Sequence, residues 1–279
     1  MAGLRNLAFV RRILFLLFVV ALVVVSVGPI YYFITVSLKT EADAIAVPPD
    51  LFLFKPTFRN YPKVFTEQPF DRYLVNSIVI SLGTVLSALV IGIPAGYALS
   101  RLQMKFKNGL LFSILAMRMI PPICLALPFF LLFNGIGLID TKRGLVLVYL
   151  TFSLPLVIWM MRTFFDDIPE ALEEAALVDG ATPFQTFYRI ALPLVKQGIV
   201  TSGILTWVLS WNEFLFAMIL TRRAARTAPV GINAFLRFQD LTWGTIAASS
   251  VTVMAPVILI AFLLRTYLIR GWTLGALKG

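Results

Sequence analysis

The sequence has no histidine and only one cysteine, Cys124, which lies inside an apolar run. Histidine is the commonest general base and the commonest metal ligand in proteins. Without histidine, and with a single thiol, zinc sites and cysteine–histidine catalysis are excluded. One cysteine cannot form a disulfide within the chain. The sequence therefore predicts no catalytic residues and no metal site.

Charged residues are also scarce. They make up 14% of the 279 residues, whereas 59% of the residues are hydrophobic. Soluble domains are nearer a quarter charged, and a water-soluble fold of this length could not bury so many apolar side chains. A protein that faces lipid need not bury them. The net charge of +10 is spread over the loops, which favours anionic lipid headgroups as partners and argues against nucleic acid.

A nucleotide-binding loop of the form Gly-x-x-x-x-Gly-Lys-Ser/Thr is absent. The chain cannot cradle a nucleotide phosphate in that manner. If the protein takes part in an ATP-driven process, a separate polypeptide must therefore hydrolyse the ATP.

The sequence does contain six apolar runs, each near the roughly 20 residues that a helix needs to cross a bilayer. The first run has too long an apolar core for a cleaved signal peptide and is interpreted as an anchor. Pro121 and Pro122 interrupt the third run, and such breaks either kink a bundle or line a wet cavity. We expect an all-α polytopic membrane protein, a single domain over residues 1–279, with spans at about 13–36, 74–99, 110–133, 144–164, 198–220 and 244–268.

The long segment after the first run, residues 37–71, holds five prolines. This composition predicts an extended, irregular loop without a long helix. The basic residues divide almost equally between alternate loops, so the positive-inside rule barely discriminates between the two orientations. The arginines ahead of the first run, Arg5, Arg11 and Arg12, favour cytoplasmic termini.

The most polar stretch, residues 165–197, lies between the fourth and fifth runs. Asp167 and Pro169 suit the start of a helix, and the glutamates that follow favour the positive end of its dipole. Gly180 can end this helix in a left-handed turn. The stretch therefore predicts a first short helix that ends at Gly180.

A second helix is predicted directly after the first. Thr182 is a candidate cap, Pro183 suits the first turn, and Pro193 is expected to end the helix before the fifth span. Its apolar stripe, at spacings i, i+3, i+4 and i+7, consists of Phe184, Phe187, Tyr188 and Ala191.

Six acidic residues precede the first basic residue of this stretch: Asp166, Asp167, Glu170, Glu173, Glu174 and Asp179. A simple connector needs no capped, amphipathic pair of helices. These features indicate a docking element for another protein, in preference to a solvated loop that lies on the headgroups.

The spacing of the stretch resembles the EAA signature of importer-type ABC permeases. The matching residues are Glu174-Ala175-Ala176, Asp179-Gly180-Ala181 and Ile190-Ala191-Leu192-Pro193. The resemblance implies a permease fold with six spans, in which this loop forms the cytoplasmic coupling helix that sits in a cleft of the ATPase subunit. The ATPase-coupling residues that it implies are Glu174, Ala175, Ala176, Asp179, Gly180, Ile190, Leu192 and Pro193, with Glu174 and Gly180 foremost.

Other segments resemble the carbohydrate-uptake branch of these permeases, in particular the maltose-type second permease subunit. They include Ala95–Arg101, Met119–Pro122, Trp211–Phe214 and the tail Gly275–Gly279. The resemblance implies a role for Gly275 and Lys278 in docking between the ATPase subunits, although a frayed terminus is the alternative.

The resemblance also implies the partners of the chain. These are a second permease subunit that forms a heterodimer, two copies of a cytoplasmic ATPase and an extracytoplasmic solute-binding protein. The chain itself binds no cofactor, and ATP and magnesium belong to the ATPase. The implied location is the bacterial inner membrane, with several crossings and both termini cytoplasmic. The expected solute is a sugar or polyol, and a phosphorylated glycerol ester is the alternative.

Polar residues inside the spans are candidates for the translocation path: Arg118, Trp211, Asn212 and Glu213. An ionisable group at that depth is costly and should face a partner or water. An ion pair between Arg118 and Glu213 is an equally supported alternative. Trp207, Trp211 and Trp243 could stack on sugar rings, but tryptophan at a span end is more often an interface anchor.

Two other classes of function are disfavoured. An intramembrane enzyme would need nucleophiles, bases or metal ligands close together, but the acids of residues 166–179 have no histidine, cysteine or lysine among them. A secondary transporter that works alone usually has more spans or inverted repeats, and no internal repeat is found in this sequence.

Overall fold

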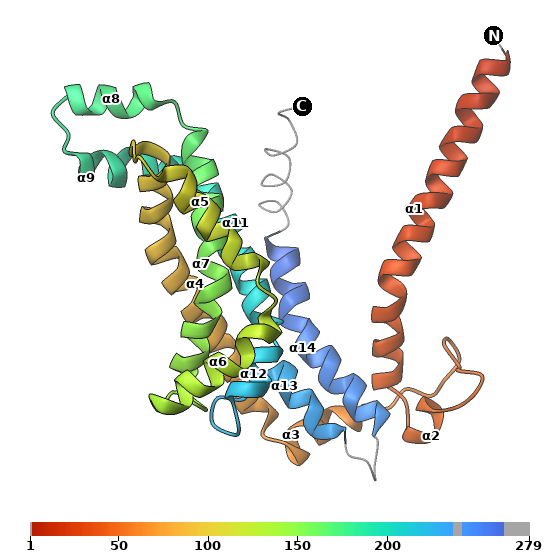
Figure 1. Cartoon of the computed structure of the whole chain (residues 1–279). Helices are drawn as coiled ribbons and strands as arrows, with labels where there is room; N and C mark the ends of the chain where they lie inside the picture. The colour runs from red at the N-terminus through yellow and green to blue at the C-terminus, as the bar shows by residue number, and fades with distance from the viewer. Residues whose placement is uncertain (1, 237–241, 265–279) are drawn as a thin grey trace. The chain divides into compact units, whose positions relative to one another are not determined.

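The computed structural model describes residues 2–236 and 242–264, and within them every regular element is a helix, which confirms the predicted all-α class (Figure 1). The chain divides into two compact units. The first consists of the residues up to Pro69 together with Ile232–Ala255, and the second of Phe70–Gly231 with the residues from Pro256. The single membrane domain predicted over residues 1–279 stays a prediction, because two compact units can belong to one membrane domain. The tail residues Gly275 and Lys278 lie outside the described part.

The first unit begins with one long helix, α1 (Ala2–Ser37). Within it, Arg11–Ser37 is long and apolar enough to span a membrane, and it buries none of its most apolar stretch against the rest of the chain. An apolar helix of this length suits a lipid environment, and the interpretation of this run as an uncleaved anchor stays a prediction. The other helices of the unit are α2 (Glu41–Ala44), α3 (Asn60–Glu67), η3 (Asn233–Phe235) and the first part of α14 (Trp243–Leu263).

Polar contacts at the end of α1 hold this unit together. The side-chain amide of Asn60 donates to the carbonyl oxygens of Ser37 and Lys39, at 2.8 Å each. Lys39 is buried, and its ammonium group donates to the carbonyl of Asp50. These contacts seat α3, whose Val64 is fully buried, against the end of α1. Within residues 37–71, predicted to form an extended, irregular loop without a long helix, eight residues form the short helix α3.

The core of the second unit is the pair α4 (Phe70–Arg101) and α7 (Lys142–Asp166), joined by α11 (Lys196–Trp211). The backbones of α4 and α7 approach closely at Gly92 and Gly96. A Cβ atom at Gly96 would lie 2.8 Å from Cβ of Met161 and 2.9 Å from the backbone nitrogen of Arg162. Only glycine fits there, so the two helices form one tightly packed pair.

The third expected span is not a single straight helix. It consists of α5 (Lys107–Ala116), η1 (Met117–Met119) and α6 (Pro122–Gly135), which meet at an angle of 91°. The break falls at Pro121 and Pro122, where proline removes two backbone donors and fixes two φ angles. A bent pair of this kind is either a broken span or a re-entrant loop.

The fifth expected span is also broken. After α11 ends at Trp211, residues 212–214 interrupt the helix before α12 (Leu215–Leu220), and α13 (Ala228–Ile232) follows the next loop. The described residues contain four helices that can each cross a membrane, or up to six spans if each bent pair counts as one. The described helices are thus consistent with the six predicted spans, and the predicted interruption of the third span at Pro121 and Pro122 is confirmed.

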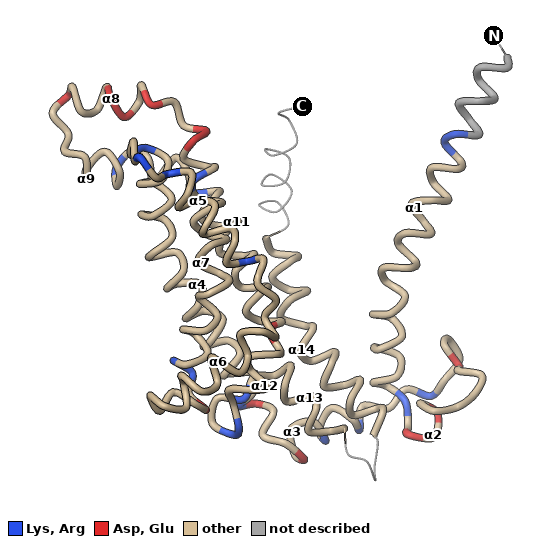
Figure 2. Tube along the Cα trace, in the orientation of Figure 1, with Lys and Arg blue, Asp and Glu red and all other residues tan. Residues whose placement is uncertain are grey.

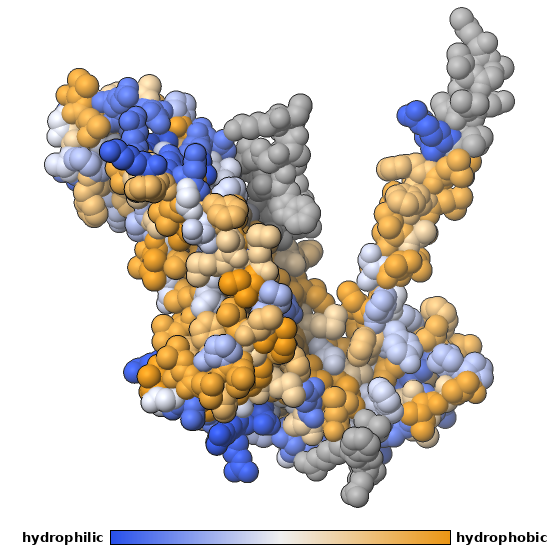
Figure 3. Space-filling model, in the orientation of Figure 1, coloured by the Kyte–Doolittle hydropathy of each residue, from blue (hydrophilic) through white to orange (hydrophobic). Residues whose placement is uncertain are grey.

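The surface agrees with a membrane location. In Figure 3 the hydrophilic residues of the helical body that holds α4–α12 gather at its two ends, and apolar residues cover the region between them. Many of these apolar side chains are exposed, among them Leu86 and Val90 of α4 and Leu127 and Leu131 of α6. Such a belt is costly in water but stable in lipid.

Candidate functional site

The acid-rich stretch at residues 165–197 forms a helical hairpin at one end of the second unit (Figures 1 and 2). Its first helix is α8 (Glu170–Val178), with Pro169 at the cap position. Gly180 follows in the left-handed conformation, with φ of 90°. The predicted first helix and its glycine stop are both confirmed.

The second helix, α9 (Pro183–Thr186), begins with a capping box. The hydroxyl of Thr182 accepts from the Gln185 amide at 3.3 Å, and the Gln185 side chain accepts from the Thr182 amide at 2.9 Å. The predicted cap at Thr182 is confirmed, and the structure adds Gln185 as its reciprocal partner, which was not predicted from the sequence. Satisfying two of the free amides in this way fixes where α9 begins.

Beyond α9 the helix widens. Residues Phe187–Ala191 form the π-helix η2, followed by α10 (Leu192–Leu194), and the axis then bends by 72° into α11. The wider turns of a π-helix rotate the residues that follow relative to an α-helix, so the side chains of the predicted apolar stripe do not lie on one face. Ala191 is buried, whereas Phe184 and Tyr188 are exposed and stack on each other with ring centres 6.5 Å apart.

The residues of the EAA signature occupy three places on the hairpin. Asp179, Gly180 and Ile190 come together around a pocket of about 280 Å³ between α8 and η2. Glu174 and Ala175 lie on the exposed side of α8, and Ala176 lies on its buried side. Leu192 and Pro193 belong to α10, which leads into the bend.

One acid of the hairpin is buried, and it is Glu173. Its neighbour Glu174 is exposed, as are the other four acids of the stretch, whereas Glu173 is 6% exposed. The guanidinium of Arg101 donates to Oε1 of Glu173 through Nε at 2.9 Å and Nη2 at 2.7 Å. The hydroxyl of Tyr97 donates to Oε2 at 2.6 Å. Both oxygens of this buried carboxylate are therefore satisfied.

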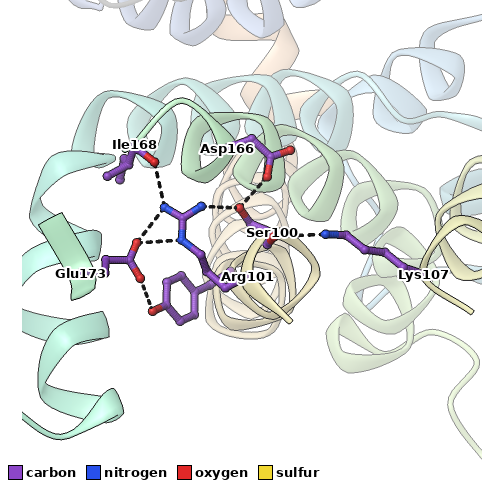
Figure 4. A network of polar contacts seen from close by, with 7 residues as sticks. Ser100, Arg101, Lys107, Asp166, Ile168 and Glu173 are labelled. Carbon is purple, nitrogen blue, oxygen red and sulfur yellow. Dashed lines mark hydrogen bonds and ion pairs between the residues drawn. The ribbon is translucent and has the colours of Figure 1, made fainter. Parts of the chain in front are cut away.

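The same arginine reaches two further groups (Figure 4). Nη2 of Arg101 donates to the carbonyl of Ile168 at 3.1 Å, and Nη1 donates to the Ser100 hydroxyl at 3.0 Å. Ser100 in turn donates to Oδ1 of Asp166 at 2.5 Å. The network thus joins the end of α4 to the end of α7 and to α8. Sequence reasoning missed Glu173 and Arg101, although Glu173 shares a helical face with the small residue Ala176.

A second site lies near the middle of the unit. Arg118 and Glu213 both line a cavity of about 480 Å³, whose other walls include Phe129, Thr151 and Phe152. Glu213 caps α12, because its carboxylate accepts from the amides of Phe216 at 2.8 Å and Ala217 at 3.1 Å. Among the described residues the ion pairs are Arg101–Glu173 and Arg162–Asp166, so the alternative pair of Arg118 with Glu213 is not formed.

Two other residues predicted for the path lie elsewhere. Trp211 is buried and stacks on Trp207, with ring centres 5.1 Å apart. Asn212 is exposed, and its side-chain amide donates to the Val208 carbonyl at 2.8 Å. Of the four residues predicted for the path, the structure thus brings Arg118 and Glu213 together at one cavity.

At the opposite end of the unit, Asp140 holds a basic loop. Its carboxylate accepts from the backbone amides of four consecutive residues at 2.9–3.2 Å: Arg222, Arg223, Ala224 and Ala225. Partial burial acts to raise the pKa of Asp140, but these amides outweigh it and hold the pKa below its ordinary value. Asp140 therefore fixes the conformation of the loop that carries Arg222, Arg223 and Arg226.

The sequence of residues 88–273 matches the family of the binding-protein-dependent transport system inner membrane component. The chain belongs to this family. The match covers the hairpin and the spans on either side of it, so the resemblance to importer-type ABC permeases is confirmed. The permease is a transport component, not an enzyme.

Curated relatives extend the match to nearly the whole permease. The trehalose transport system permease protein SugB of Mycobacterium tuberculosis is 40% identical over 258 residues, which is 90% of this chain and 92% of that protein. The trehalose/maltose transport system permease protein MalG of Thermococcus litoralis is 32% identical over 273 residues, covering 96% of this chain and 98% of that protein.

The fold also occurs in a solved complex. A chain in the crystal structure of a bacterial ABC transporter involved in the import of the acidic polysaccharide alginate superposes with a TM-score of 0.76 at 23% identity, over 94% of this chain and 96% of that chain. This likeness supports the polytopic importer fold of the permease.

Proposed function

We propose that this permease is one of two membrane-spanning subunits of an ATP-driven importer for a sugar or polyol. The observation that carries the proposal is the hairpin of α8 and α9, which presents exposed acids from a helix anchored by the buried pair of Arg101 and Glu173. The carbohydrate names of the relatives SugB and MalG support the class of solute.

In this proposal the exposed face of α8 docks into a cleft of a cytoplasmic ATPase. Two ATPase copies hold ATP and magnesium, a second permease completes the path, and an extracytoplasmic binding protein delivers the solute. ATP binding closes the ATPase pair, the hairpin follows that motion, and the spans reopen to the other side. The permease itself performs no covalent step and lies in the inner membrane with both termini cytoplasmic.

The cavity lined by Arg118 and Glu213 is the proposed part of the solute path in this subunit. An arginine and a carboxylate at this depth can bind hydroxyl groups as donor and acceptor. Aromatic walls at Phe129 and Phe152 suit the apolar face of a sugar ring.

A phosphorylated glycerol ester is the second candidate solute. The observation in its favour is the basic loop that Asp140 fixes at the far end of the unit from α8, with Arg222, Arg223 and Arg226. A cationic rim of this kind attracts an anionic solute or an acidic face of the binding protein.

The test reconstitutes the permease with its partner permease, ATPase and binding protein in proteoliposomes. Uptake of radiolabelled trehalose, maltose and glycerol phosphodiesters is measured with ATP inside. We expect ATP-dependent uptake of a neutral sugar and its loss in Gly180→Val, because valine does not tolerate a φ of 90°. Two results contradict the proposal. One is uptake without ATP. The other is a complex that hydrolyses ATP in response to its binding protein but takes up none of these solutes.

A further inference from the structure

We propose that Arg101 and Tyr97 are positioning residues that lock α8 to the end of α4 through Glu173, so that α8, α4 and α7 move as one body. This inference rests on the proposed function, because it assigns the route by which a motion of the hairpin enters the spans. The reasons lie in three properties of the network: its geometry, its burial and the rigidity of the helices that it joins.

The geometry makes Glu173 a fixed point. Its two carboxylate oxygens accept three hydrogen bonds, two from Arg101 and one from Tyr97, all at 2.9 Å or less. Both donors belong to the last turn and a half of α4, four residues apart on one face. A rotation or shift of α8 relative to α4 would break all three bonds at once, so the contact has one favoured arrangement.

Burial makes the contact costly to open. The side chains of Arg101 and Glu173 are 13% and 8% exposed. An ion pair shielded in this way leaves an uncompensated buried charge when it separates, unlike a solvated pair at the surface. The pair Arg162–Asp166 is a local contrast, since it lies within α7 and its carboxylate side chain is 41% exposed.

Tyr97 adds an apolar part to the lock. Its ring packs on Phe165 of α7 with centres 5.1 Å apart and on Phe187 of η2 at 4.7 Å, while its hydroxyl holds Glu173. One side chain of α4 therefore contacts both ends of the hairpin. Since the preceding residue, Gly96, lets α4 and α7 pack closely, a displacement of α8 is passed to two spans together.

The experiment measures the distance between α8 and α4 in the assembled complex in nanodiscs, by electron–electron double resonance. Spin labels are placed at Val178→Cys on α8 and Leu86→Cys on α4, both exposed positions, in a Cys124→Ser background. Copurification of the ATPase establishes that the labelled parent assembles. Spectra are recorded without nucleotide and with ATP and vanadate.

For the parent we expect one narrow distance distribution that is the same in both states. Glu173→Gln, which removes the charge and keeps the shape, should broaden the distribution or add a second distance. Arg162→Met, which breaks the partly exposed pair with Asp166 within α7, should leave it unchanged. The exchange Arg101→Glu with Glu173→Arg should restore much of the narrow component.

Two results would overturn the inference. One is a distribution for Glu173→Gln as narrow as that of the parent, and the other is a parent distance that differs between the nucleotide states. Neither result touches the proposed function, which fails separately if the ATPase does not copurify with the parent complex.

Discussion

Glu173 and Glu174 are consecutive residues of α8, yet one is buried and the other is exposed. Glu173 is 6% exposed and bound by Arg101, whereas Glu174 lies on the exposed side of the helix. Successive positions on an α-helix point about 100° apart, so one residue can serve the fold while the next serves a partner. The hairpin thus has an inner acid that anchors it and outer acids that remain available.

The first prediction concerns the two arginines that pair with acids in this region. Arg101→Met leaves Glu173 buried without its cation and should lower stability by about 3–5 kcal/mol. Arg162→Met breaks a partly exposed pair and should cost only about 0–1 kcal/mol. Hydrogen exchange of the α8 amides measures the difference, with fast exchange expected in Arg101→Met. Equal protection of α8 in both variants would show that the pair does not anchor the hairpin.

The second prediction concerns the packing of α4 on α7. Gly96→Ala places a methyl group 2.9 Å from a backbone nitrogen that cannot move aside, and should destabilise the permease by about 1–3 kcal/mol. Gly203→Ala in α11 is the control, because its nearest neighbour is a leucine methyl group at 3.6 Å and helix propensity favours alanine by up to about 1 kcal/mol. The melting temperature in detergent should fall for the first variant and hold or rise for the second.

The sequence predicted much of this site, for reasons that are local. Three signals each depend on only a few neighbouring residues: a proline in the first turn, the glycine stop at Gly180 and the cap at Thr182. The helix α8, its end at Gly180 and the start of α9 all lie where these signals predicted them. The choice between Glu173 and Glu174 is not local, because it depends on which side of α8 meets Arg101, 72 positions away in the chain. The composition and spacing of the hairpin alone do not determine which side of α8 faces Arg101.

The broken spans show the same limit. The double proline at Pro121 and Pro122 marked an interruption, but the angle of 91° also depends on the neighbours of the two helices, which are α7 for α5 and α12 for α6. The break at residues 212–214 carries no proline. It is stabilised by Glu213 as the cap of α12, a role that its position inside an apolar run did not suggest.

The third prediction concerns Asp140 and pH. The pKa of this carboxyl is lowered by backbone amides in the folded state, so its contribution is present above the unfolded pKa of about 3.9 and is lost as the pH falls through the folded value. Asp140→Asn should therefore cost about 1–2 kcal/mol at neutral pH.

The difference in melting temperature between the parent and Asp140→Asn should shrink as the pH is lowered from 7 to 3. Asp71→Asn, which removes an exposed charge at the start of α4, is the control and should change the melting temperature much less. A difference for Asp140→Asn that is constant over this range would mean that its charge is not what holds the loop.

The fourth prediction separates two roles of Glu213. Glu213→Leu removes the cap of α12 and should lower stability by about 1 kcal/mol. Glu213→Gln keeps one acceptor oxygen, enough for one of the amides of Phe216 and Ala217, and should keep most of the parent melting temperature. If Glu213 also lines the solute path, sugar uptake by Glu213→Gln falls severalfold at nearly unchanged stability. Unchanged uptake in this variant would restrict Glu213 to its structural role.

The most direct test of the account is a cross-linking measurement on the outer face of α8. Glu174→Cys, in a Cys124→Ser background, is treated with a bifunctional thiol reagent in inverted membrane vesicles that contain the whole complex. Arg222→Cys, on the basic loop that Asp140 holds, is the control. We predict that Glu174→Cys forms a cross-link to the ATPase subunit and that Arg222→Cys does not. Labelling of Glu174→Cys from the outside of intact cells, or a cross-link to the ATPase from Arg222→Cys alone, would contradict the account.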